Sequence, residues 1–161
     1  MKPLFFDADN KPSFLPIDFR DRYEGYILKA GDILISMTGT IGKTDYGNVC
    51  IIDKEKEYLL NQRVGKFFFT TKNVNRKFIY YLANQYFFKE SILKNSAGGV
   101  RQANISSQQI ESIKIPLPDL ATQERIVAQI EREQALVKAN RELIEIFEQK
   151  IKGRIAKVWG E

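Results

Sequence analysis

An apolar residue at every seventh position near the C-terminus is the feature that most constrains this chain. The repeat consists of Ile130, Val137, Ile144, Ile151 and Val158. No proline and a single glycine, Gly153, lie between positions 120 and 158, so little in the sequence opposes a continuous helix. Asp119, just before this segment, is a favoured N-cap residue. The pattern therefore predicts one helix of about 37 residues, about 55 Å long at 1.5 Å per residue.

Such a helix is too long for a domain of this size to cover its whole apolar stripe. A domain of about 120 residues has a radius of gyration of about 14 Å, so much of the stripe requires a partner helix. Asn140 falls on the same seam, where a polar residue can fix the register of pairing. We expect the following residues to face that partner: Ile130, Val137, Asn140, Ile144, Phe147 and Ile151. The alternative is a helix that folds back on its own domain.

The first 119 residues differ in composition from the rest, with all five prolines and eight of the ten glycines. Short apolar runs at 33–37, 49–52 and 65–70 predict strands. A helix is expected over about 75–94, a short capped turn over 106–110 and an extended segment over 113–118. The fold class is therefore α+β. We expect a globular unit at 1–119 with short strands and a helix, and one long helix at 120–161 that pairs with another helix as a coiled coil.

The composition excludes several kinds of chemistry. The chain has no histidine, which removes His-based acid–base catalysis and His metal sites. Its one cysteine, Cys50, allows neither an internal disulfide nor a cysteine-cluster metal site. No apolar run approaches the roughly 20 residues that span a bilayer, and no signal peptide is recognisable. We expect a cytoplasmic protein without a membrane segment, metal or cofactor.

Two motifs resemble catalytic sites, but each lacks a feature that the chemistry requires. Gly39–Thr44 resembles the end of a phosphate-binding loop, but Met37 stands where that motif requires a glycine. Asp119 and Glu148-Gln149-Lys150 match a loose nuclease pattern. On one continuous helix, however, Glu148 lies about 43 Å from Asp119, so the two carboxylates do not converge on a metal ion. No assembled set of catalytic residues is expected.

Positive charge is concentrated in one block. The chain carries a net charge of +5, but residues 61–101 alone hold eight basic side chains against the single acid Glu90, which leaves +7. Aromatic residues are interspersed through this block. A basic stretch of this kind attracts a polyanion such as nucleic acid, although the same pattern also occurs on solvated helix faces.

Three segments in this order, followed by the long helix, resemble the DNA specificity subunit of type I restriction–modification systems. The first is Lys29–Lys43, the second Leu60–Val64, and the third runs from Gln102–Ser106 through Ile113–Pro118 to Gln123–Val127. The resemblance covers about residue 28 to the end. It implies a target recognition domain and a long spacer helix, which usually occur twice in one chain.

What the resemblance implies is a non-catalytic subunit. Each recognition domain reads half of a split double-stranded DNA site, the two helices pair antiparallel as a spacer, and modification (methyltransferase) and restriction subunits assemble on it. This sequence has one recognition unit with a shortened N-terminal part and one helix. It therefore resembles a half-subunit or the C-terminal part of a specificity subunit, and a half-subunit is expected to form a homodimer through its helix.

Side chains beside predicted loops and strand ends are the expected DNA contacts. Arginine can hold guanine and an amide side chain can pair with adenine, while lysine and threonine bond phosphate oxygens. The candidates are Thr40, Lys43, Arg63, Lys66, Arg101, Gln102 and Asn104. An alternative function remains open, in which the helix dimerises as a scaffold and the globular part binds another protein rather than DNA.

Overall fold

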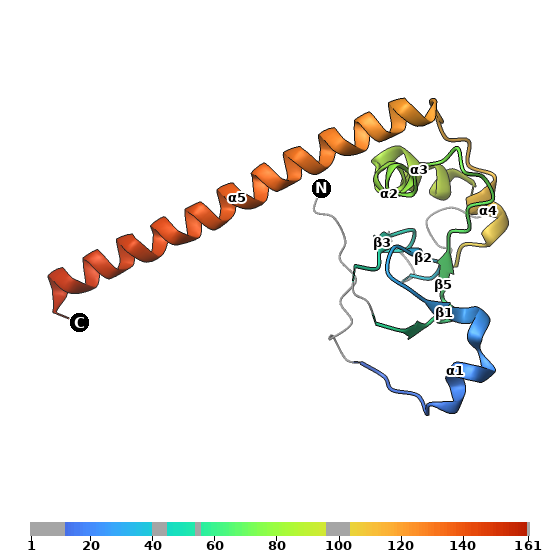
Figure 1. Cartoon of the computed structure of the whole chain (residues 1–161), viewed down its shortest axis with the longest axis horizontal. Coiled ribbons are helices and arrows are strands. Elements are labelled where there is room, and N and C mark those ends of the chain that lie inside the picture. Colours follow the sequence, from blue (N-terminus) through green and yellow to red (C-terminus); the bar gives the residue numbers. More distant parts are fainter. Residues whose placement is uncertain (1–11, 40–44, 54–55, 96–103, 161) are drawn as a thin grey trace.

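The computed structural model describes residues 12–39, 45–53, 56–95 and 104–160 (Figure 1). A globular part contains all elements but the last, and the final helix projects from it as a long rod. The elements in chain order are α1 (Asp18–Arg22), the 3-10 turn Glu24–Tyr26, β1 (Ile27–Leu28), β2 (Ile33–Ser36), β3 (Val49–Ile51), β4 (Tyr58–Leu59), β5 (Val64–Lys66), α2 (Arg76–Ala83), α3 (Tyr86–Asn95), α4 (Ser107–Glu111) and α5 (Leu120–Trp159).

Two small antiparallel sheets form the centre of the globular part. In the larger one β2 lies between β3 and β5, with Ile35 opposite Val49 on one side and Gly65 on the other. β1 and β4 pair as a separate two-stranded sheet. Because successive side chains of a strand point to opposite faces, β2 contributes to two cores at once.

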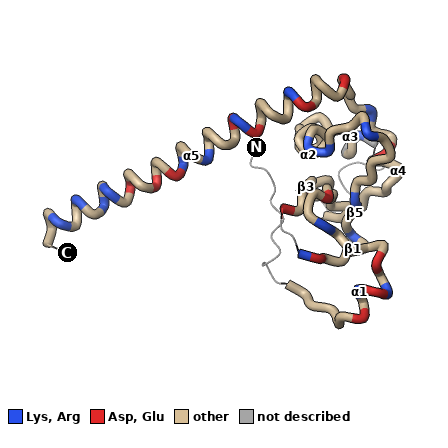
Figure 2. Tube along the Cα trace, viewed as in Figure 1, with Lys and Arg blue, Asp and Glu red and all other residues tan. Residues whose placement is uncertain are grey.

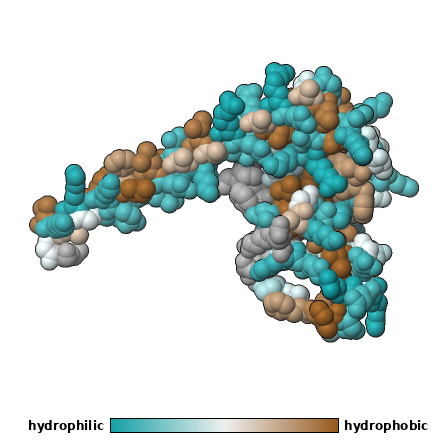
Figure 3. Space-filling model, viewed as in Figure 1, coloured by the Kyte–Doolittle hydropathy of each residue, from teal (hydrophilic) through white to brown (hydrophobic). Residues whose placement is uncertain are grey.

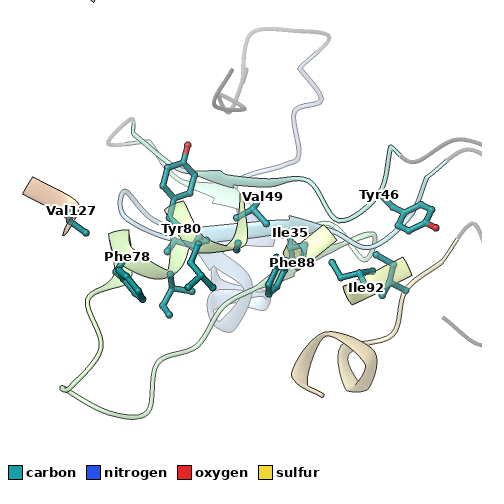
Figure 4. Packing of buried hydrophobic residues seen from close by; sticks show 13 residues of the cluster. Ile35, Tyr46, Val49, Phe78, Tyr80, Phe88, Ile92 and Val127 are labelled. Carbon is teal, nitrogen blue, oxygen red and sulfur yellow. The ribbon is translucent and has the colours of Figure 1, made fainter. Parts of the chain in front are cut away.

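The larger core lies between the three-stranded sheet and the helices. Ile33 and Ile35 of β2 belong to it, together with buried residues of α2 and α3. Figure 4 shows the labelled sheet residues Ile35 and Val49 close to Phe88. On the opposite face, Leu34 packs with Leu28 and Ile52 in a smaller cluster. Both faces of β2 are therefore buried, which agrees with its uninterrupted run of apolar residues.

The single helix expected over 75–94 is wrong, because the chain forms two helices there. α2 begins after Asn75, whose side chain accepts a hydrogen bond from the Phe78 backbone N–H. It ends at Asn84, where the side-chain amide donates to the Tyr80 carbonyl at 2.9 Å. Gln85 donates in the same way to the Tyr81 carbonyl. The Gln85 backbone N–H donates instead to the Leu82 carbonyl at 3.0 Å, so a side-chain amide takes the place of the backbone donor at Tyr81, and the chain turns before α3.

The shorter elements and Cys50 agree with the sequence-based expectations in part. The strand expected over 65–70 ends at Lys66, and α1, β1 and β4 were not predicted. The short capped turn is confirmed as α4, where Ser106 and Gln109 form a reciprocal capping box. Cys50 is partly buried against the smaller core, and this burial raises the pKa of its thiol.

The predicted long helix is confirmed and is slightly longer than expected. α5 contains 40 residues, and the side chain of Asp119 caps it by accepting from the Thr122 backbone N–H at 2.8 Å. Gly160 ends it in a left-handed conformation with φ of 75°, which favours glycine. Within the part of the chain that the structure describes, none of the helices has the length and apolar character required to cross a membrane.

The larger core predicts a clear contrast between two isoleucines. Ile92 of α3 is fully buried, whereas Ile17 is 84% exposed. Replacing Ile92 by alanine removes packed methyl groups and leaves a cavity, so we expect Ile92→Ala to lower the free energy of unfolding by about 2–5 kcal/mol. Ile17→Ala should change it by less than about 0.5 kcal/mol. Urea unfolding followed by circular dichroism measures both, and equal effects would contradict the assigned core.

Candidate nucleic-acid interface

Three segments that are distant in sequence meet around Met37, at the end of β2. The Met37 backbone N–H donates to the Arg63 carbonyl at 2.9 Å, and its carbonyl accepts from the Ile105 N–H at 2.8 Å. The next residue, Thr38, forms a β-bridge with Asn104. We call this set (Met37, Thr38, Arg63 and Asn104) the Met37 edge. It brings together parts of all three sequence segments that carried candidate DNA contacts.

Two of the candidate residues are described at this edge. Arg63 is exposed and its backbone is fixed by a turn, in which its N–H donates to the Asn61 side-chain oxygen at 2.9 Å. Asn104 is also exposed and is held by the bridge to Thr38. Four further candidates lie outside the described residues: Thr40, Lys43, Arg101 and Gln102.

Glycine is required where the chain leaves the Met37 edge. A Cβ atom on Gly39 would lie 2.9 Å from the ring of Tyr46 and would overlap the Asp45 carboxylate. Gly47, two residues after Asp45, has φ of 69°, and a Cβ there would lie 2.9 Å from Ile92. Such positions have no room for a larger residue. The two glycines therefore allow the turn at 45–48 to pack closely against this edge and α3.

Lys66 differs from the other candidates because its charge is already paired. Its ammonium group lies 2.7 Å from the Asp32 carboxylate, and the two side chains are only 20% and 13% exposed. Asp32 also accepts a hydrogen bond from the Lys29 backbone N–H. In the register of the sheet Lys66 lies opposite Leu34, whose side chain packs in the smaller core. The structure therefore gives Lys66 an internal ion-pair partner in place of open solvent.

Other basic residues of the positive block at 61–101 also have partners within the fold. Lys77 pairs with Glu131 and Lys94 with Glu90, and Lys89 donates to the Asn48 side-chain oxygen at 3.0 Å. Figure 2 shows basic residues distributed over several elements of the globular part. Among the described residues of the block, four basic side chains have no acidic partner: Arg63, Lys72, Arg76 and Lys89. The positive charge available to a polyanion is smaller than the sequence indicates.

The first four turns of α5 attach the helix to the globular part. Gln123 and Val127 are buried there. Farther along, Glu131 accepts from Lys77, and the Tyr81 hydroxyl donates to Gln134 at 3.2 Å. The hydrogen bond to Glu131 raises the pKa of Lys77, which favours the charged ammonium group that makes the ion pair.

Beyond Gln134 the apolar side of α5 has no partner among the described residues. Ile130 is partly buried and lies at the boundary. The other predicted partner-facing residues are exposed, to between 48% and 57% for the apolar ones: Val137, Asn140, Ile144, Phe147 and Ile151. Figure 3 shows hydrophobic residues gathered along the projecting helix. The alternative, in which the helix folds back on its own domain, is therefore wrong. We call the exposed apolar residues from Leu136 to Trp159 the α5 stripe.

The rejected nuclease pattern does not assemble in space. Asp119 caps the start of α5, and hydrogen bonds from the Thr122 backbone and side chain lower its pKa. Glu148 lies on the projecting part of the same helix. Over the described ranges, no three His, Cys, Asp or Glu residues come together in a way that would hold a metal ion.

Gln123 is the structurally important residue that the sequence analysis missed. Its side chain is fully buried and forms hydrogen bonds with three backbone groups of neighbouring segments. A signal was present in the sequence, because Gln123 lies four residues before Val127 on the face that continues into the heptad repeat. A polar residue on an apolar helix face requires internal hydrogen-bond partners.

Comparison with known proteins gives matches to a single family. The family model described as "Type I restriction modification DNA specificity domain" matches residues 8–149. The "Type I restriction enzyme MjaVIII specificity subunit" of Methanocaldococcus jannaschii is 33% identical over 131 residues, which are 80% of this chain and 30% of that protein. The "Type I restriction enzyme EcoAI specificity subunit" of Escherichia coli is 32% identical over 117 residues, 73% of this chain and 20% of that protein.

The chain thus spans less than a third of the length of either curated relative. Among solved structures, a chain from work on complex assembly and conformational transition of the type I R-M system aligns with a TM-score of 0.48 and 19% identity. That alignment covers 70% of this chain and 25% of the other.

The Asp32–Lys66 pair generates a prediction about stability. Lys66→Met leaves a poorly exposed carboxylate without its cation, so we expect the free energy of unfolding to fall by about 1–3 kcal/mol. Lys72→Met, at an exposed lysine, serves as the matched control and should change it by less than about 0.5 kcal/mol. Denaturant titration of both variants measures the difference. A Lys66→Met variant as stable as the control would show that the ion pair contributes nothing to the fold.

Proposed function

The chain belongs to the family of type I restriction–modification DNA specificity domains, and on this premise we propose that it reads one half of a bipartite double-stranded DNA site. The observation that carries the proposal is the convergence at the Met37 edge. There the exposed residues Arg63 and Asn104 pair through their backbones with two successive residues, Met37 and Thr38. The edge is attached to β2, whose side chains are buried on both faces.

The exposed groups at the Met37 edge suit contacts with DNA. A guanidinium group can bond two acceptors of guanine in the major groove, and a side-chain amide can do the same with adenine. The backbone of Arg63 is constrained by two hydrogen bonds, one at its N–H and one at its carbonyl. A fixed backbone lowers the entropy lost when the side chain binds. Phosphate contacts from neighbouring basic residues would add affinity without sequence preference.

We propose that the chain contributes recognition and no catalysis, and that methyltransferase and restriction subunits supply the chemistry after docking on its helical region. The MjaVIII and EcoAI relatives are named as specificity subunits of restriction enzymes. The carboxylates of the loose nuclease pattern lie on separate parts of α5, which supports the same interpretation. We propose the globular part as the target recognition domain, with the boundary at 119, and α5 as the spacer.

We further propose that a second copy of this chain covers the α5 stripe in an antiparallel dimer. The support is a partial symmetry of the stripe: in each of three pairs of exposed apolar residues, the two members lie equally far along the helix from the point between Phe147 and Glu148. The pairs are Leu136 with Trp159, Val137 with Val158, and Ile144 with Ile151. A two-fold axis at that point would bring each residue opposite its counterpart. The dimer would carry two identical reading surfaces, suited to a palindrome divided by a spacer.

Arg63→Ala tests the reading surface. We expect this variant to weaken the binding of duplex DNA by about 1–3 kcal/mol and to reduce the slope of log K against log salt concentration by about one, because one cationic contact is lost. Binding is titrated at two salt concentrations with the full chain assembled with its modification subunits, on a pool of random-sequence duplexes. The same assembly is then assayed for site-specific methylation.

An arginine outside the Met37 edge provides the matched control. Arg22 is an exposed residue of α1, and Arg22→Ala should leave affinity and salt slope unchanged. If an active assembly methylates no specific site, the recognition function is wrong. If binding shows little salt dependence and Arg63→Ala resembles Arg22→Ala, the globular part does not bind DNA through this edge, and a protein partner becomes the better interpretation.

A further inference from the structure

The direction in which α5 leaves the globular part depends on a short attachment. Side-chain contacts between α5 and that part run from Gln123 to Gln134, a distance of about 16 Å along the helix. From Gln134 to Trp159 the helix projects without a partner among the described residues for about 37 Å. A small rotation at the attachment therefore becomes a large displacement at the far end.

Gln123 is the most buried polar group at this attachment, with no exposed surface. Its side-chain oxygen accepts from the Asn75 backbone N–H at 2.8 Å. Its side-chain nitrogen donates to the carbonyls of Pro118 at 2.7 Å and Asn73 at 3.2 Å. Asn75 is also the N-cap residue of α2. One amide thus connects the start of α5 with the segment that begins α2.

Only glutamine satisfies all three of these backbone groups from this position. A glutamate keeps the acceptor and loses both donors, and methionine has the same length but makes none of the bonds. Groups left buried without a partner cost about 1–3 kcal/mol each. The arrangement therefore has one favoured geometry, in which both ends of the amide are bonded.

The outer contacts of the attachment are weaker constraints. The Lys77 and Glu131 side chains are 54% and 41% exposed, and the hydrogen bond from Tyr81 to Gln134 is also exposed. Exposed ion pairs contribute little to stability. Val127 and the partly buried Ile126 pack against the larger core, but packing of this kind leaves a scatter of about 15–20° in the angle of a helix. The angle between α5 and the globular part is therefore held chiefly by the hydrogen bonds of Gln123.

We propose that Gln123 is a positioning residue that fixes the spacer length accepted by the dimer. The inference depends on the proposed function, because it assumes that two reading surfaces are held apart by paired α5 helices. A rotation of about 5° at the attachment moves the far end of a 37 Å arm by about 3 Å, close to the rise of about 3.4 Å per base pair. Selecting one spacer length over the next requires an attachment stiffer than this.

The test compares Gln123→Met with Gln129→Met, a matched change at an exposed glutamine of the same helix. The full assembly is titrated with duplexes whose identical half-sites, taken from the site that the wild type methylates, are separated by spacers differing in single base pairs. We expect wild type and Gln129→Met to prefer one spacer at least tenfold over its neighbours. Gln123→Met should reduce this preference to about threefold or less and leave the affinity for a single half-site unchanged.

A second readout does not depend on DNA. In a chain with Cys50 replaced by alanine, the substitutions Lys72→Cys and Lys138→Cys provide attachment points for two spin labels. The labelled chains are diluted with unlabelled protein. The labels then report the distance from the globular part to α5. Gln123→Met should broaden this distance distribution, and Gln129→Met should not. Circular dichroism verifies folding; if Gln123→Met is unfolded, Gln123→Glu, which retains the acceptor for Asn75, takes its place.

The outcomes separate the two proposals. If the wild type selects no bipartite site, the proposed function fails. If the wild type selects one spacer, and Gln123→Met is folded and selects it equally well with an unbroadened distance distribution, the role of Gln123 is wrong. Unfolding of both Gln123 variants would make Gln123 a residue required for folding and would overturn its assignment as a positioning residue.

Discussion

The structure depends on a mismatch between the length of α5 and the surface that its own chain offers it. About four turns of this 40-residue helix are attached to the globular part, through Gln123, Val127 and the contacts of α2. The helix then continues with large apolar side chains that are about half exposed. Helices in proteins gain most of their stability from packing an apolar face, and an exposed stripe of this size is typical of an interaction surface. The globular part thus has two buried cores of its own, whereas the apolar side of α5 beyond Gln134 has no partner among the described residues.

The Met37 edge and the α5 stripe lie in separate parts of the structure and are held by different forces. The Met37 edge is an extension of β2, so its geometry follows from backbone hydrogen bonds and from two cores that bury both faces of that strand. The α5 stripe is displaced from that edge by a rigid rod whose direction is set near Gln123. In such an arrangement recognition and spacing are independent properties. Under the proposed function, a substitution at the edge would change which groups meet the DNA, and a substitution at the attachment would change where they meet it.

The sequence predicted those features whose signal is local. The heptad repeat and Asp119 identified α5, and the apolar run at 33–37 identified β2, because each pattern reflects one continuous element. The break between α2 and α3 was missed because it depends on Asn84 and Gln85 donating to nearby carbonyls, where the apolar pattern continues. β1 and β4 contain two residues each, too few for a period. The pairing of Lys66 with Asp32 joins residues 34 positions apart, and a charge count does not show such contacts.

Covalent cross-linking measures the pairing of α5 most directly. In a chain with Cys50 replaced by alanine, the double variant Val137→Cys, Val158→Cys should form a disulfide-linked dimer under mild oxidation, because antiparallel helices centred beside Phe147 bring these two positions together across the interface. Each single variant should remain monomeric on a non-reducing gel, since its cysteines would lie about 31 Å apart along the axis. Efficient cross-linking of either single variant to itself would indicate parallel helices. No cross-linking of the double variant at any protein concentration would show that a second copy does not cover the stripe, and either result would contradict the account.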